Sequence, residues 1–83
     1  MIVGQKSSST LRDVIIGTAE RLAEIDAQYR TLVRMPDVSM RRIQTNRSER
    51  WWIEKDYDDA RAELIRRNEE HTIPYWARNP KAS

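Results

Sequence analysis

The chain has 83 residues, no cysteine, a single histidine and a net charge of +2. This length allows one small domain, and a domain of this size buries only about 60% of the surface that its unfolded chain exposes. The absence of cysteine excludes disulfides, and one histidine argues against a structural metal site. We therefore expect the missing stability to come from self-association or from docking on a larger assembly.

No apolar run approaches the roughly 18 residues of a membrane-spanning helix, and the N-terminus lacks the apolar core of a signal peptide. The sequence thus predicts a soluble, intracellular protein without membrane contact. Charge is segregated along the chain: residues 36–53 carry four positive and two negative side chains, whereas residues 54–71 carry four and seven.

Residues 1–9 are expected to form a flexible lead, and a long helix should follow from about residue 10 to 35. Ser9 or Thr10 can cap it, with Asp13 at the capping-box spacing. Apolar residues then recur at helical spacing. Pro36 is expected to end the helix at or before Met35.

Residues 37–54 allow two interpretations. The preferred one is a β-hairpin, with arms over residues 38–45 and 49–54 and a turn at residues 46–48, because Trp51, Trp52 and Ile53 favour strands. The alternative is a helix whose thin and interrupted apolar face holds Met40, Ile43, Arg47 and Trp51.

A second helix is expected from Glu54 or Asp56 to about residue 71, with acidic residues in its first turn and arginines in its last. Residues 72–83, which contain two prolines, should form an extended tail. The predicted fold class is therefore α+β and mostly α, with one α-β-β-α domain over residues 10–71.

The sequence contains few candidate catalytic residues, since His71 has no cysteine to activate and no serine lies in a nucleophile motif. The sequence predicts no enzyme, no cofactor and no metal site. The basic segment is a candidate contact to DNA or to an acidic partner through Arg41, Arg42, Arg47 and Arg50, although solvated charges at a strand edge explain it equally well.

Aromatic residues supply the second set of candidates. In a strand Trp51 and Trp52 would point to opposite faces, which makes Trp52 a candidate interface anchor. If the segment is a helix, the equally favoured expectation is that both lie on a broad buried face. Aromatic residues beside prolines indicate that the tail becomes ordered against a surface, either on a partner or on its own domain. The candidate partner-binding residues are Trp52, Ile73, Tyr75, Trp76 and Arg78.

The order of these elements resembles the gpW-like head-to-tail joining proteins of tailed bacteriophages. The residues that carry the likeness are 22–27 (LAEIDA), 41–47 (RRIQTNR) and 51–60 (WWIEKDYDDA). Trp51-Trp52 and the turn without glycine depart from the family pattern.

The resemblance implies a virion protein that forms a ring beneath the portal, closes the DNA-filled head and binds the next tail component, with its C-terminal tail needed for joining. Its location would be the virion, and the host cytoplasm during assembly. Two other functions remain open: a small nucleic-acid-binding or regulatory protein that uses the basic segment, and an inhibitor or adaptor that docks on a host protein.

Overall fold

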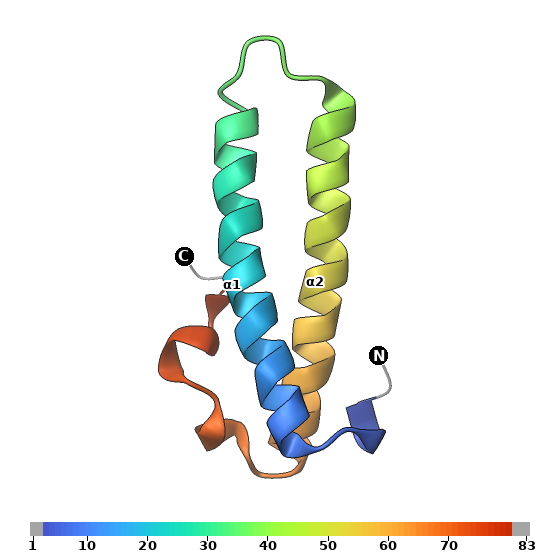
Figure 1. Ribbon diagram of the computed structural model, residues 1–83, viewed down its shortest axis with the longest axis vertical. Coiled ribbons are helices and arrows are strands. Elements are labelled where there is room, and N and C mark those ends of the chain that lie inside the picture. Colours follow the sequence, from blue (N-terminus) through green and yellow to red (C-terminus); the bar gives the residue numbers. More distant parts are fainter. Residues whose placement is uncertain (1–2, 81–83) are drawn as a thin grey trace.

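Two antiparallel helices, joined by one short loop, make up most of the structure (Figure 1). The computed structural model describes residues 3–80, so that residues 1–2 of the expected lead and 81–83 of the expected tail lie outside it. Helix α1 spans Ser8–Leu32 and helix α2 spans Met40–Arg66. Three short 3-10 turns flank them, η1 (Val3–Gln5), η2 (Glu70–Thr72) and η3 (Tyr75–Ala77).

The long first helix is present, and its ends differ slightly from those expected. Ser7 is the cap, since its hydroxyl accepts a hydrogen bond of 3.2 Å from the backbone N–H of Thr10. The helix stops at Leu32, before Pro36, and the backbone N–H groups of Arg34 and Met35 then make i→i−3 hydrogen bonds of 3.2 Å.

The predicted β-hairpin is wrong, because residues 40–54 form the first half of α2 and residues 3–80 contain no strand. The α+β class is therefore corrected to a helical hairpin. Ser39 caps α2, with its hydroxyl 3.3 Å from the N–H of Arg42. Residues that face α1 recur at alternating steps of three and four, which is helical spacing: Ile43, Asn46, Arg50, Ile53, Tyr57, Ala60 and Leu64.

Helix α2 ends through a left-handed residue. Asn68 has φ 59°, and the N–H groups of Asn68 and Glu69 bond to the carbonyls of Ile65 and Leu64 at 3.0 and 2.8 Å. This pair of hydrogen bonds is a Schellman motif, which turns the chain back toward α1.

The expected extended tail is instead folded onto the two helices. Ile73 is 1% exposed and Ala77 is fully buried, both in the same cluster as residues of α1 and α2. The hydroxyl of Tyr57 donates a hydrogen bond to the carbonyl of Ala77. The tail thus forms a third layer over one end of the hairpin (Figure 1).

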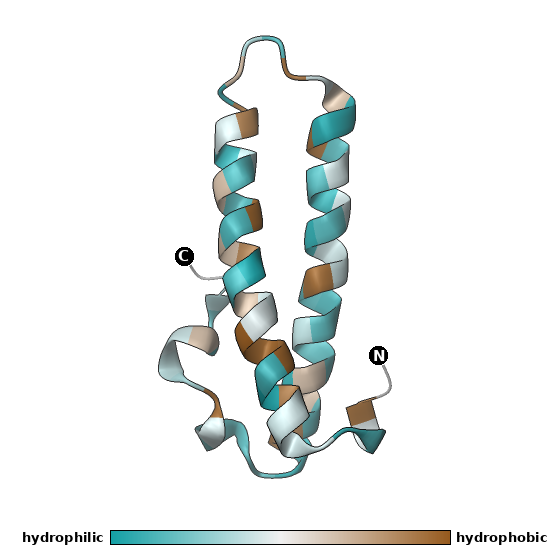
Figure 2. Ribbon diagram, viewed as in Figure 1, coloured by the Kyte–Doolittle hydropathy of each residue, from teal (hydrophilic) through white to brown (hydrophobic). Residues whose placement is uncertain are grey.

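The core is concentrated at the end of the hairpin where the tail packs. The cluster consists of Leu11, Ile15, Ala19, Tyr57, Ala60, Leu64, Ile73 and Ala77. Toward the loop, the inward residues Tyr29, Leu32 and Ile43 are only half-buried. The first half of α2 is also mainly hydrophilic (Figure 2). The loop end of the hairpin is therefore the less covered end.

Candidate functional site

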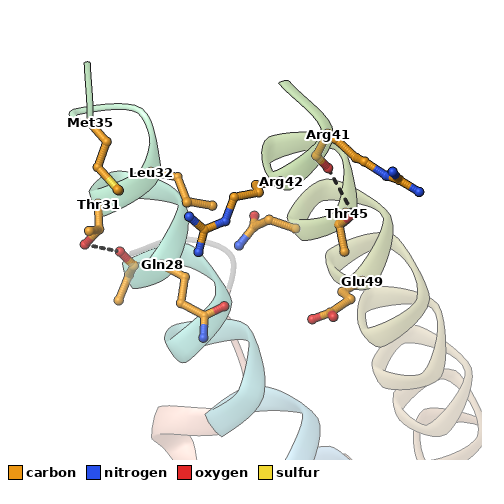
Figure 3. Close-up of a pocket in the computed structure, with 10 residues that line it drawn as sticks. Gln28, Thr31, Leu32, Met35, Arg41, Arg42, Thr45 and Glu49 are labelled. Carbon is orange, nitrogen blue, oxygen red and sulfur yellow. Dashed lines mark hydrogen bonds between the residues drawn. The ribbon is translucent and has the colours of Figure 1, made fainter. Parts of the chain in front are cut away.

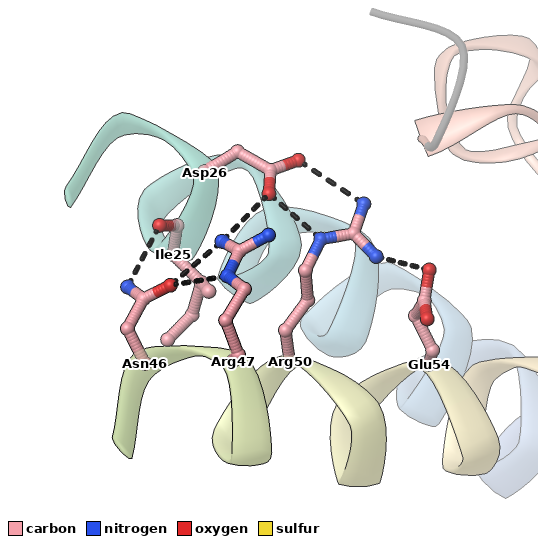
Figure 4. A network of polar contacts seen from close by, with 6 residues as sticks. All are labelled: Ile25, Asp26, Asn46, Arg47, Arg50 and Glu54. Carbon is pink, nitrogen blue, oxygen red and sulfur yellow. Dashed lines mark hydrogen bonds and ion pairs between the residues drawn. The ribbon is translucent and has the colours of Figure 1, made fainter. Parts of the chain in front are cut away.

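A polar cluster links the two helices in the loop-side half of the hairpin (Figure 4). Arg50 of α2 donates hydrogen bonds of 2.8 and 3.3 Å to the carboxylate of Asp26 on α1, and it also pairs with Glu54. Its hydrogen bonds to Asp26 are the main reason why the pKa of Asp26 lies below its ordinary value and that of Arg50 above. These ionic contacts link the two helices.

Arg47 belongs to the same cluster. Its guanidinium lies 3.7 Å from a carboxylate oxygen of Asp26 and 3.8 Å above the ring of Tyr29, a cation–π contact. Two of the four arginines expected at the basic site, Arg47 and Arg50, are thus engaged within the hairpin (Figure 4).

Asn46 is a buried polar residue beside this cluster. Its side-chain amide donates a 3.1 Å hydrogen bond to the carbonyl of Ile25, and its oxygen accepts two from Arg47. Both ends of the amide are therefore satisfied, as burial requires. Asn46 marks the boundary between the packed core and the open loop end.

Beyond Asn46 the helices border a groove of about 740 Å³ (Figure 3). Residues of α1, of the loop and of α2 line it: Ala27, Gln28, Thr31, Leu32, Met35, Arg41, Arg42, Thr45, Asn46 and Glu49. Leu32 and Met35 give the groove an apolar wall, and Arg42 points from α2 toward α1 (Figure 3).

The groove has a basic end. Arg41 and Arg42 are exposed, and neither guanidinium forms an ion pair within residues 3–80. The acidic group in the lining, Glu49, is paired with Arg21 at 3.3 Å. The groove therefore offers apolar surface beside two uncompensated positive charges.

The tryptophan pair lies outside the groove, on the outer face of α2. The rings of Trp51 and Trp52 meet edge to face with centroids 4.7 Å apart, and the residues are 55% and 62% exposed. The expectation that they point to opposite faces of a strand is wrong, because they are consecutive residues of a helix. A shallow depression beside them is lined by Trp51, Glu54, Lys55, Asp58 and Asp59.

The candidate residues of the tail divide into two groups. Ile73 is buried, and the guanidinium of Arg78 donates to the carbonyls of Ile73 and His71 at 3.0 and 3.1 Å, so both hold the tail in place. Tyr75, 88% exposed, and Trp76, 55% exposed, point away from the core. A partner contact for these two aromatic residues stays a prediction.

A second ionic cluster ties the N-terminal lead to the end of α2. The buried carboxylate of Glu63 accepts hydrogen bonds from Arg66 and Arg67, which lower its pKa to about 2. Arg67 also donates to the hydroxyl of Ser8 and the carbonyl of Lys6, at 3.1 and 2.9 Å. Glu63 and its two arginines lie within four residues of one another, whereas the contacts of Arg67 with Lys6 and Ser8 span about 60 residues, and no sequence pattern predicted them.

Within residues 3–80 no three histidine, cysteine or acidic side chains are grouped so that they could hold a metal ion. In the same part of the chain, no helix combines the length and the apolar character needed to cross a membrane. The prediction that the chain is no enzyme stays a prediction.

Comparison with known proteins supplies no family for the chain: no family model, curated protein or solved structure matches it. The β-hairpin expected from the likeness to gpW-like proteins is absent from residues 3–80, because the segments of residues 41–47 and 51–60 lie in one continuous helix.

Proposed function

We propose that the chain is a non-enzymatic structural adaptor that acts as one copy of an oligomer and joins larger components of an assembly. The observation that carries the proposal is the one-sided core, which leaves an apolar groove with a basic end uncovered at the loop. Apolar surface of this kind is stabilised when another protein covers it.

The resemblance suggests which assembly this is: a phage-like virion, in which the chain would join the portal to the next tail component. Because the structure has a helix where the family has a β-hairpin, contacts to neighbours would use helix faces and the loop end. Portal and tail genes beside the gene for this chain would support the proposal, and their absence would count against it.

The exposed tail aromatics provide a direct test. Truncation after Glu70 is unsuitable, because it removes Ile73 and Ala77 from the core. The double variant Tyr75→Ala/Trp76→Ala removes only exposed aromatic surface. Particles assembled with this variant should contain filled heads and free tails in electron micrographs, while Asn79→Ala, an exposed neighbour, should give joined particles.

Joined particles at the wild-type yield from the Tyr75→Ala/Trp76→Ala variant would contradict a joining role for the tail. Thermal unfolding of the purified variant should match that of the wild type, which separates a lost contact from a lost fold.

Nucleic-acid binding is the competing proposal. Because Arg47 and Arg50 are paired with Asp26 inside the hairpin, only Arg41 and Arg42 of the four candidate arginines remain for contact with DNA. It requires an affinity for duplex DNA that falls steeply with salt. A gel shift at low salt without a retarded band would remove it.

A further inference from the structure

Two surfaces of the described chain are complementary to each other. The groove surface consists of Leu32, Met35, Arg41 and Arg42, and the tryptophan surface consists of Trp51, Trp52, Asp58 and Asp59. We infer that the groove surface of one copy binds the tryptophan surface of a second copy. This inference rests on the proposed oligomer and names the contact that builds it.

The two arginines of the groove surface stand where helix energetics favour the opposite charge. Arg41 and Arg42 are the second and third residues of α2, which has no acidic residue in its first turn. The N-terminus of a helix carries a partial positive charge and stabilises acidic side chains. Neither arginine has an ion-pair partner within residues 3–80, so a negatively charged partner would stabilise both.

The tryptophan surface carries that negative charge. Residues 54–59 contain four acidic residues and one lysine. Glu54 pairs with Arg50 and Asp59 with Lys55, and with both cations counted residues 50–59 still keep a net charge of −2. The other exposed aromatic pair, Tyr75 and Trp76, belongs to a segment, residues 72–80, that contains Arg78 and no acidic residue. Charge therefore selects Trp51 and Trp52, rather than the tail, as the occupant of the groove.

Size and polarity agree with this choice. The groove has a volume of about 740 Å³ and an apolar wall formed by Leu32 and Met35. An aromatic side chain that becomes buried covers roughly 150–250 Å². Two exposed indoles supply the large, rigid apolar groups that commonly anchor protein interfaces.

One copy cannot make this contact with itself. Arg41 and Trp51 lie ten residues apart on the same helix, which separates them by about 15 Å along its axis. The contact joins different patches of two copies, so an open chain of copies always presents one free groove at one end and one free tryptophan surface at the other. Such a heterologous contact closes into a ring or continues as a filament.

Mixing two variants tests the inference. The groove variant Arg41→Glu/Arg42→Glu keeps its tryptophan surface, and the tryptophan variant Trp51→Ser/Trp52→Ser keeps its groove. At about 100 µM in sedimentation velocity, the wild type should form species larger than a dimer. Each variant alone should be a monomer, and the 1:1 mixture should form a heterodimer that grows no further.

The exposure of all four side chains makes folded variants the expectation, and glutamates at the second and third positions of α2 suit the helix dipole. The matched control is Arg30→Glu/Arg34→Glu, which changes the charge equally near the loop but does not line the groove. It should assemble like the wild type, with an affinity at least tenfold above that of the groove variant.

A monomeric wild type, a groove variant that still assembles, or a control that fails to assemble would each overturn this contact. So would a mixture that remains monomeric. If the contact fails while the Tyr75→Ala/Trp76→Ala variant still blocks particle joining, the adaptor function stands without it. If the wild type assembles in solution as described but the Tyr75→Ala/Trp76→Ala variant joins particles normally, the contact between copies stands and the joining role of the tail fails.

Discussion

Arg50 occupies an inward position of α2 that an apolar residue would normally fill. Its aliphatic stem can pack between the helices while the guanidinium reaches Asp26 on α1 and Glu54 on its own helix. Desolvation offsets much of the attraction in such pairs. The contact therefore stabilises one alignment of the helices more than it stabilises the fold.

Replacing both partners tests this interpretation. Asp26→Leu alone should lower the free energy of unfolding by about 1–3 kcal/mol, since it leaves Arg50 unpaired across the helices, while the double variant Asp26→Leu/Arg50→Leu should be as stable as the wild type or more so. Urea denaturation measures both. A double variant whose loss equals the sum of the two single losses would contradict the argument.

Protonation of Glu63 is expected to lower the free energy of unfolding at acidic pH. Hydrogen bonds from Arg66 and Arg67 lower its pKa in the folded chain from about 4.5 to about 2. Because the folded pKa is the lower one, this stabilisation is complete above about pH 4.5 and is lost as the pH falls toward 2. The stability difference between wild type and Glu63→Gln should therefore shrink over this window, as measured by urea denaturation at pH 7, 4 and 2.5.

An unchanged difference across the same pH values would show that the carboxylate is not the source of the acid sensitivity. Asp26, whose pKa is also lowered by its arginine partner, adds a contribution of the same sign. Glu63→Gln should leave that contribution in place.

At the scale of single elements, α1 was predictable because its apolar residues alone define the helical period. The second half of α2 was predictable for the same reason, from Tyr57, Ala60 and Leu64. The first half was not, because its inward positions include Asn46 and Arg50. Their partners, the carbonyl of Ile25 and the carboxylate of Asp26, lie on the other helix and leave no local signal.

The candidate site was predictable only in part. Aromatic composition pointed to Trp52, Tyr75 and Trp76, and all three are exposed in the structure. The groove was missed because it is made by α1, the loop and α2 together. The sequence did point to Arg41 and Arg42 as candidate contacts, but their place at the start of a helix beside an apolar wall needed the structure.

Gly17 is the weak position of α1. It lies in the helix interior, and a Cβ added there would meet no atom within 4 Å. Gly17→Ala should thus raise the free energy of unfolding by about 1 kcal/mol, since alanine loses less backbone entropy on folding. The midpoint of urea denaturation should rise with an unchanged slope. A lower midpoint would mean that the glycine has a packing role.

At the scale of the whole molecule, the tail completes the core. Ile73→Ala should lower the free energy of unfolding by about 2–4 kcal/mol, as deletion of a buried aliphatic side chain does. Tyr75→Ala, only two residues away but 88% exposed, should change it by less than about 0.5 kcal/mol. Thermal melts of the two variants compare them, and equal losses would contradict this packing of the tail.

The buried amide of Asn46, the seventh residue of α2, separates a short, poorly covered loop end from the longer and better covered rest of the hairpin, and the two parts should differ in their motions. Amide protons near the loop, in residues 28–32 and 43–45, should exchange with solvent through local opening, whereas those of the tail-covered core should exchange only when the whole chain unfolds. Hydrogen exchange at the loop end would then report directly on occupancy of the groove. A bound neighbour would slow exchange there first, while the protection of the core would change little.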